Sequence, residues 1–203
     1  MKTDILKFQK PVFLQWKSKL RFADISQDSF ERWLFVQVSG VILGGKTGEL
    51  LILKNDIFEL PFDNCLDHIG SFCKSWKLSH SVLVMNGSTL KFIIYSEEAV
   101  NLRLKQASKK ILHCHLRYPF GLSAKTFLHE LSLRWQKSGR IPHEIGIALG
   151  YPLKDVWGFM GLNNFRCNGS CGWQIFGDPE PSRRIRARYE NARKRAEILL
   201  RAA

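Results

Sequence analysis

Residues 140–160 read RIPHEIGIALGYPLKDVWGFM, and this stretch says more about the fold than any other part of the chain. Pro142 and Pro152 stand where proline can begin a helix, because the first turn needs no hydrogen bond from that backbone nitrogen. Gly150 stands where a helix ends. Residues 142–160, the corner segment, are therefore predicted to form two short helices that meet at a tight turn.

Outside the corner segment, short strand patterns alternate with separate helical ones. Residues 81–95 contain two apolar runs joined by Asn86-Gly87, which is a strong hairpin signal. Ser96 and Ser123 each precede a helical pattern and are expected to act as N-caps. One hairpin among several helices predicts an α+β layer fold with a small, mainly antiparallel sheet, and argues against a doubly wound α/β sheet.

The remaining patterns add elements on both sides of the hairpin. Helices are predicted over residues 28–41 and 61–76, and a last helix begins at the start signal of residues 177–182. Short strands are predicted over residues 49–53 and 173–176. Residues 1–27 alternate basic and large apolar side chains without a clear period, and Pro11 interrupts them. We interpret them as a peripheral N-terminal arm in front of a single α+β domain, residues 28–203.

Charge is the most unusual bulk property of the chain. Its 203 residues carry a formal net charge of +13, which suits a polyanionic partner such as nucleic acid or an acidic protein. A solvated basic face that only keeps the protein soluble accounts for the charge equally well. Residues 182–203 hold eight Arg or Lys and two Glu, so nearly half the excess lies on the last predicted helix. The candidate contacts to an anion or a nucleic acid are Lys46, Lys154, Arg183, Arg184, Arg186, Arg188, Arg193, Lys194 and Arg195.

The sequence also predicts a cytoplasmic protein without a membrane partner. Charged residues interrupt the N-terminus where a secretory signal needs an apolar core, and no run reaches the roughly 18 apolar residues of a membrane span. The five cysteines are an odd number, which argues against a disulfide framework and for a reducing compartment.

Residues 40–47, GVILGGKT, match the phosphate-binding pattern GxxxxGK[ST] letter for letter. In that motif the backbone N–H groups of small residues surround phosphate oxygens, with a strand before the loop and a helix after it. Here three large apolar residues occupy the loop, a helix is predicted before it, and a strand is predicted after it. We therefore interpret residues 40–47 as a helix end whose glycine turn leads into a strand.

The corner segment also has the small-residue and turn-glycine spacing of a DNA-binding helix-turn-helix. In such a unit the exposed face of the second helix enters the major groove. Here that helix offers Lys154, Asp155 and little other hydrogen-bonding capacity for base edges. Helical corners of this shape are also frequent in protein cores, so both interpretations stay open.

His143 and Glu144 raise the question of an acid–base pair at the start of the corner segment. Adjacent positions on a helix point about 100° apart, so the two side chains do not face each other. A glutamate in the first turn compensates the helix dipole, and a histidine there serves as a surface or capping group. We therefore expect a non-catalytic protein.

Metal-ligand residue types occur at His113, His115, Cys167 and Cys171. The Cys-x3-Cys spacing is looser than the two-residue gap of a zinc knuckle, and His-x-His suits a metal site only in a strand. The other interpretation is that these thiols are buried or idle in a reducing cell. A metal- or cofactor-dependent redox role therefore rests on ligand type alone.

Three segments together resemble a known bacterial family, domain of unknown function 3793. Residues 142–159, PHEIGIALGYPLKDVWGF, are similar to its Pro-His-Glu-Ile-Gly, Leu-Gly-Tyr-Pro and Asp-Val hallmark. Residues 171–178, CGWQIFGD, resemble its Cys-Gly-Tyr-Trp-Lys-Val-Tyr-Gly-Asp segment, and residues 41–46, VILGGK, stand where it has a Leu-Ala-Gly-Ile-Lys type of stretch. The resemblance covers roughly four fifths of the chain, from Phe30 onward. It implies no activity or cofactor, and it marks positions of unknown role at His143, Glu144, Gly150, Tyr151, Pro152 and Asp155.

The chain departs from this family pattern in two places. The family has His-Cys-Ala-Pro where this chain has QVSG at residues 37–40, so any role of that thiol is absent here. The Cys-Gly segment is also one residue shorter. Because the family pattern is not GxxxxGK[ST], the resemblance argues further against a nucleotide site at residues 40–47.

These observations predict a non-catalytic binding or accessory module whose contact surface is the basic C-terminal helix. The alternative is a nucleic-acid-binding protein that uses the corner segment together with that helix. A second alternative is a metal- or cofactor-dependent redox protein, which the family resemblance favours only through gene position, since relatives often lie near flavodoxin genes.

Overall fold

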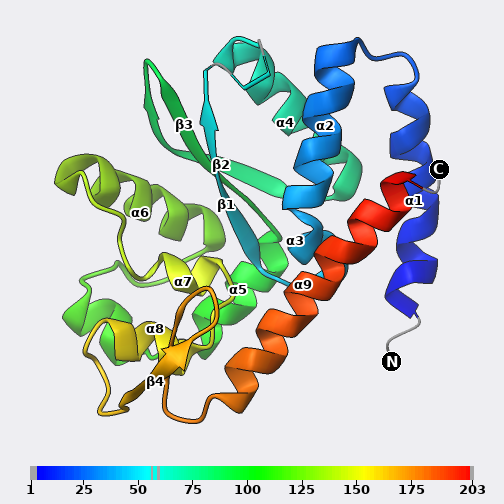
Figure 1. Cartoon of the computed structure of the whole chain (residues 1–203). Helices are drawn as coiled ribbons and strands as arrows, with labels where there is room; N and C mark the ends of the chain where they lie inside the picture. Colours follow the sequence, from blue (N-terminus) through cyan, green and yellow to red (C-terminus); the bar gives the residue numbers. More distant parts are fainter. Residues whose placement is uncertain (1–3, 56, 59, 202–203) are drawn as a thin grey trace.

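A computed structural model of the chain describes residues 4–55, 57–58 and 60–201. At its centre is a three-stranded antiparallel sheet in the order β1-β3-β2 (Figure 1). The strands are β1 (Gly48–Lys54), β2 (Ser79–Asn86) and β3 (Thr89–Tyr95). Strands β2 and β3 form the predicted hairpin, so the α+β class and the small antiparallel sheet are confirmed.

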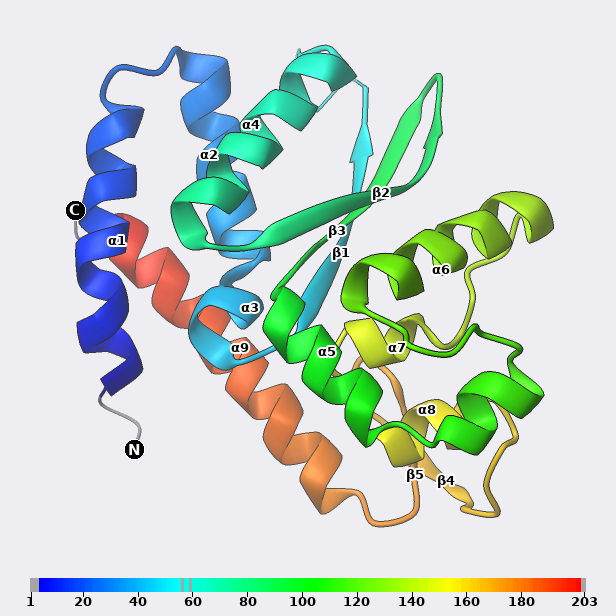
Figure 2. The same cartoon turned by 180° about the vertical axis from the view of Figure 1, so that it is seen from behind.

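Helices cover both faces of this sheet (Figures 1 and 2). One face packs against α2 (Ile25–Gln37) and α4 (Phe62–Trp76), and the other against α5 (Glu97–Gln106) and α6 (Ala124–Ser138). Helix α1 (Asp4–Leu20) packs on the outer side of α2 and α4. Side chains of a strand alternate between faces, and β3 shows this directly. Phe92 and Ile94 belong to the first apolar core, whereas Ile93 and Tyr95 belong to the second.

Local signals set the helix ends that the sequence predicted. The Ser96 hydroxyl accepts a hydrogen bond from the Ala99 N–H at 3.3 Å, and Ser123 forms a capping box with Thr126. Gly139, with a φ of 67°, ends α6 in the left-handed conformation that glycine adopts without strain. These caps satisfy backbone groups that a helix end otherwise leaves without partners.

The N-terminal segment differs from its prediction as a peripheral arm. Most of it forms α1, and Phe13, Trp16 and Leu20 are buried in the first core. The Trp16 ring stacks on Phe35 with centroids 5.0 Å apart. The prediction of a peripheral arm is therefore wrong for the part of α1 that contributes side chains to the core. Pro11 lies inside the helix and obscured the helical spacing of the three apolar residues.

Three other elements differ from the patterns in the sequence. The helix predicted over residues 28–41 is divided into α2 and α3 (Ser39–Gly44), with Val38 between them. A π-helical turn, η1 (Ile111–His115), and a strand, β4 (Cys167–Ser170), were not predicted. Strand β4 pairs with β5 (Gln174–Phe176).

The last helix, α9 (Glu180–Arg201), runs along the molecule from the β4–β5 hairpin to α1 (Figure 1). It buries Tyr189, Ala192 and Ala196 and leaves most of its arginines exposed. Among the described helices, none has the length and apolar character needed to span a membrane.

Candidate functional site

The corner segment forms α7 (Ile145–Ala148) and α8 (Leu153–Phe159), as its proline and glycine signals predicted. Gly146 lets the two helices approach closely, because a Cβ at that position would lie 2.9 Å from a methyl carbon of Val156. Gly150 has a φ of +77° and adjoins Thr47 and Tyr189, whose hydroxyl donates to the Gly150 carbonyl at 3.2 Å. The turn therefore attaches the corner to both β1 and α9.

Asp155 is the centre of a closed polar network inside this corner. It is 1% exposed and accepts hydrogen bonds from the Trp173 indole N–H at 2.9 Å and the Ser182 hydroxyl at 2.6 Å. It also accepts one from the backbone N–H of Phe176 at 2.8 Å. The Lys154 ammonium donates to Asp155 at 2.6 Å, to the Phe176 carbonyl at 2.6 Å and to Ser182 at 3.1 Å. We call these five residues the corner network.

The corner network leaves α8 without a reading face for nucleic acid. Asp155, Val156, Trp157 and Gly158 are all buried, and the one lysine of α8 donates to acceptors within the protein. A recognition helix must instead expose a polar face to the major groove. The helix-turn-helix interpretation of the corner segment therefore has no support in this geometry.

His143 and Glu144 point to different surroundings, as their adjacent positions predicted. Glu144 is 5% exposed and accepts from the Tyr118 hydroxyl at 3.0 Å, while the Arg134 guanidinium lies over the Tyr118 ring at 3.8 Å. Burial, followed by the nearby Glu144 charge, raises the pKa of Tyr118 well above its usual range. The His143 ring instead meets Phe159 edge to face at 4.8 Å. Glu144 thus holds a buried structural cluster, and His143 lies outside it.

Residues 40–47 adopt the helix-turn-strand order that excludes a P-loop. Gly40 and Gly44 lie in α3, Gly45 is left-handed with a φ of 66°, and β1 follows at once. The Lys46 N–H donates to the Gly40 carbonyl at 2.9 Å, so this backbone closes on itself. The prediction of a glycine turn leading into a strand is confirmed.

Lys46 lies instead in a small polar pocket between α3, β1, the corner and α9. The pocket has a volume of about 120 Å³ and is lined by Gln37, Ser39, Gly40, Lys46, Glu49, Tyr151, Trp173, Arg186, Tyr189, Glu190 and Arg193. Lys46 is 9% exposed, and its ammonium donates to Glu49 at 2.8 Å. Arg186 lies against Gly172, where a Cβ would come within 2.7 Å of the guanidinium, and donates to Glu190 at 2.7 Å.

Two aromatic rings form the wall that the polar pocket shares with an apolar one. Tyr151 stacks on Trp173 with centroids 4.5 Å apart and planes inclined by 18°. Burial, followed by the nearby Glu49 charge, raises the pKa of Tyr151 to about 12, so its hydroxyl is neutral at physiological pH. The adjoining apolar pocket has a volume of about 350 Å³, and both rings line it together with Leu50, Ile141, His143, Ile145, Leu149, Val156 and Phe159.

A family model described as protein of unknown function (DUF3793) matches residues 34–202. The chain belongs to this family. The three segments that carry the family resemblance are far apart in sequence and supply Lys46, Tyr151 and Trp173 to the polar pocket. No curated protein and no solved structure matches the chain.

The other family-motif positions serve this same region in different ways. Gly150 and Pro152 shape the turn of the corner, and Asp155 holds the Trp173 ring through its indole N–H. Sequence reasoning placed Lys46, Tyr151 and Arg186 among its candidates but missed Glu49 and Trp173 as their neighbours. These side chains come together only because segments far apart in the sequence pack against one another, and no local sequence pattern indicates that packing.

The predicted metal ligands do not assemble. His113 and His115 lie on the π-helical turn η1, where the His113 ring contacts the Tyr118 carbonyl at 2.9 Å. Cys167 begins β4 at the open end of the β4–β5 hairpin, where it pairs with Phe176, whereas Cys171 lies in the turn at the other end. Within the residues that the structure describes, no group of three or more His, Cys, Asp or Glu could hold a metal ion.

Proposed function

We propose that this member of the DUF3793 family is a non-catalytic binding module for a small anion that carries an apolar, preferably aromatic, body. The anionic group occupies the polar pocket, and the body packs against Tyr151 and Trp173 toward the apolar pocket. Ligand sites commonly combine an apolar wall with a few placed polar groups, and these two adjoining pockets have that composition.

The proposal rests on the small number of hydrogen-bond acceptors around the Lys46 ammonium. An ammonium group has three N–H donors, and buried polar groups in folded proteins are hydrogen-bonded. Among the described residues Lys46 has one hydrogen-bond acceptor, Glu49, while the rings of Tyr151 and Tyr189 flank it at 6.0 and 5.4 Å. A ligand anion in the pocket would satisfy the remaining donors.

Two arginines of α9 extend this positive lining. Arg186 and Arg193 line the pocket from one flank of the helix, and with Lys46 they give three cations against the two carboxylates of Glu49 and Glu190. A guanidinium presents two parallel N–H donors to a carboxylate or a phosphate. Arg193 also pairs with Glu197 at 3.5 Å, so these charges nearly balance. The donors of Lys46 beyond its bond to Glu49, together with the two guanidinium groups, favour an anionic ligand group over a neutral one.

Thermal unfolding in the presence of phenyl phosphate, inorganic phosphate or phenol tests the proposal. A ligand that binds only the native state stabilises it by about 2.7 kcal/mol at a hundredfold excess over its dissociation constant. We expect the largest rise in Tm with phenyl phosphate, a smaller rise with inorganic phosphate and none with phenol. The proposal fails if neither anion raises Tm, or if phenol raises it as much as phenyl phosphate does.

The second candidate function is nucleic-acid binding through the outer face of α9. Three arginines of this helix form i, i+4 ion pairs with Glu180, Glu190 and Glu197. Arg183, Arg188 and Lys194 are exposed and form no ion pair with any described residue. Such cations can contact phosphates along a duplex without reading its sequence.

Binding of a fluorescein-labelled DNA duplex across a salt series tests this second candidate. Phosphate contacts make log K fall linearly with log salt, and Lys194→Gln should reduce that slope by about one. Lys137→Gln, an exposed lysine of α6, is the matched control and should leave the slope unchanged. An affinity indifferent to salt, or no binding at low salt, rules out this function.

A further inference from the structure

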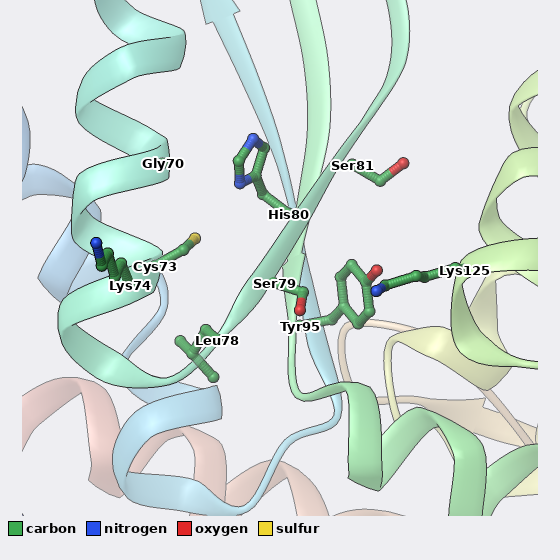
Figure 3. Close-up of a pocket in the computed structure, with 9 residues that line it drawn as sticks. All are labelled: Gly70, Cys73, Lys74, Leu78, Ser79, His80, Ser81, Tyr95 and Lys125. Carbon is green, nitrogen blue, oxygen red and sulfur yellow. The ribbon is translucent and has the colours of Figure 1, made fainter.

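Strand β2 has one edge paired with β3 and another that faces a groove between α4 and α6. The groove has a volume of about 430 Å³, and Gly70, Lys74, Ser79, His80, Ser81 and Lys125 are among the residues that line it (Figure 3). His80 points to the α4 side of the strand, whereas Ser81 and Tyr95 point to the side of Lys125. We call this space the edge groove.

The strand register shows which backbone groups face the edge groove. The Ser96 N–H donates to the Thr47 carbonyl at 2.9 Å, directly beyond the pair Gly48 and Tyr95 of the β1–β3 ladder. Hydrogen-bonded pairs alternate along an antiparallel ladder, so Tyr95 directs its own N–H and C=O toward β2. Its partner there is Ser79. The same alternation turns the N–H and C=O groups of His80, the next residue of β2, away from the sheet and into the groove.

The rest of this edge is already occupied. The register of β2 against β3 shifts between Val82 and Val84. The intervening Leu83 carbonyl accepts hydrogen bonds from the Ser132 hydroxyl at 2.7 Å and the Gln136 amide at 3.1 Å, both on α6. Bulges and covering helices are usual ways to protect an edge strand from pairing. Here that protection stops short of the first half of β2.

The walls of the edge groove are open and positively charged. Gly70 lies within α4, where glycine costs about 1 kcal/mol relative to alanine, and a Cβ there would meet only the His80 ring, at 3.8 Å. Lys74 on α4 and Lys125 on α6 are exposed on opposite walls of the groove. The Lys125 ammonium nitrogen also forms an exposed ion pair with a Glu97 carboxylate oxygen at 3.6 Å. Cys73 supplies no nucleophile, because burial raises the pKa of its thiol to about 12.

We propose that the edge groove binds an extended acidic peptide segment, which adds a fourth strand to the sheet beside β2. Strand addition takes its affinity from main-chain hydrogen bonds and its specificity from pockets for alternate side chains. The lysines on the two walls favour acidic side chains on the added strand. They disfavour a second copy of this chain, which would bring the same lysines and a net charge of +13. The site is separate from the polar pocket and does not depend on its function.

Fluorescence anisotropy with a labelled peptide of alternating Glu and Val residues tests this proposal directly. The control peptide has the same sequence with its central backbone nitrogens methylated, which removes the N–H donors and keeps the charge. We expect the unmodified peptide to bind at least about tenfold more tightly, a difference of about 1.4 kcal/mol. Equal affinity for the two peptides overturns strand addition.

Three variants locate the binding. Lys74→Gln combined with Lys125→Gln should weaken the unmodified peptide about tenfold, whereas Lys137→Gln on the exposed face of α6 should leave it unchanged. Gly70→Leu should remove binding by filling the groove, with circular dichroism to verify the fold. Peptide affinity unaffected by either change overturns the proposal. So does a concentration-dependent dimer that Gly70→Leu abolishes, because that result assigns the groove to a second copy.

Discussion

Lys154 and Lys46 are both shielded lysines near the corner segment, yet the structure uses them differently. Lys154 donates to Asp155, to the Phe176 carbonyl and to Ser182, so all three of its N–H groups have protein acceptors. Lys46 has one such acceptor, Glu49, and lines a cavity. The first lysine therefore stabilises the fold, and the second retains binding capacity. Residue type and burial alone do not distinguish the two roles.

Trp173 connects the two regions. Its indole N–H donates to Asp155 in the corner network, and its ring stacks on Tyr151 at the wall of the polar pocket. A hydrogen-bonded indole has a fixed ring plane, so the closed network orients a wall of the open pocket. Loss of the network should consequently affect binding as well as stability.

The largest effect is expected from Asp155→Ala. This change removes the acceptor of four hydrogen bonds and leaves the Lys154 charge without its carboxylate, which typically costs about 3–5 kcal/mol for a buried pair. Urea unfolding measures the loss, and Asp67→Ala, at an exposed position of α4, is the matched control. If both variants lose less than about 1 kcal/mol, the corner network does not stabilise the fold.

A glycine pair gives the next largest effect. A Cβ at Gly158 would lie 2.2 Å from the Phe176 ring, so Gly158→Ala should destabilise the chain by about 1–3 kcal/mol through overpacking beside the corner network. Gly70→Ala, also within a helix, makes only an ordinary contact with the His80 ring at 3.8 Å and should stabilise the chain by up to about 1 kcal/mol. Thermal unfolding of the two variants compares them. Changes of the same sign would contradict this packing.

The dependence of stability on pH should distinguish the edge groove, which His80 lines, from the corner network. Burial lowers the pKa of His80 below its usual 6.5, so the unfolded chain binds this proton more tightly than the folded one. The stability that depends on neutral His80 is present above pH 6.5 and is lost as the pH falls through the folded-state pKa. His80→Gln should make the urea midpoint less sensitive to acid, whereas the exposed-site control His129→Gln should not. Equal acid sensitivity in all three proteins would contradict this assignment.

The smallest effect concerns the pocket itself. Glu49 competes with any anion for the Lys46 ammonium, and its side chain is 25% exposed. Glu49→Gln should tighten phenyl phosphate binding about threefold, because a partly exposed ion pair contributes at most about 1 kcal/mol. Glu180→Gln breaks a more exposed ion pair outside the pocket and should leave the affinity unchanged. Weaker binding by Glu49→Gln would show that Glu49 supports the ligand.

Turns and helix caps, which short-range interactions determine, were predicted correctly from the sequence. The Asn86-Gly87 hairpin and the caps at Ser96 and Ser123 depend on a few adjacent residues, and all three are present. Helix α1 was missed because Pro11 lies within it, and β4 because its residues are all exposed and show no alternation. A short, fully exposed strand has no hydrophobic pattern from which it can be predicted.

The candidate site was only partly predictable for a different reason. The sequence identified Lys46, Tyr151 and Arg186 separately, as a motif lysine, a family position and a basic helix residue. It could not show that one cavity joins them, since this depends on how α9 crosses the corner and β1. It also could not show that Lys154, an equally plausible anion contact, donates into the corner network.

Isothermal titration of phenyl phosphate into the wild-type chain, Arg186→Gln and Arg184→Gln tests the central claim most directly. Both arginines form an i, i+4 ion pair on α9, but only Arg186 lines the polar pocket. A lost charge-assisted hydrogen bond of about 1.5–3 kcal/mol predicts at least tenfold weaker binding for Arg186→Gln and an unchanged affinity for Arg184→Gln. Equal affinities for the three proteins, or equal losses in the two variants, would contradict a binding site at Lys46.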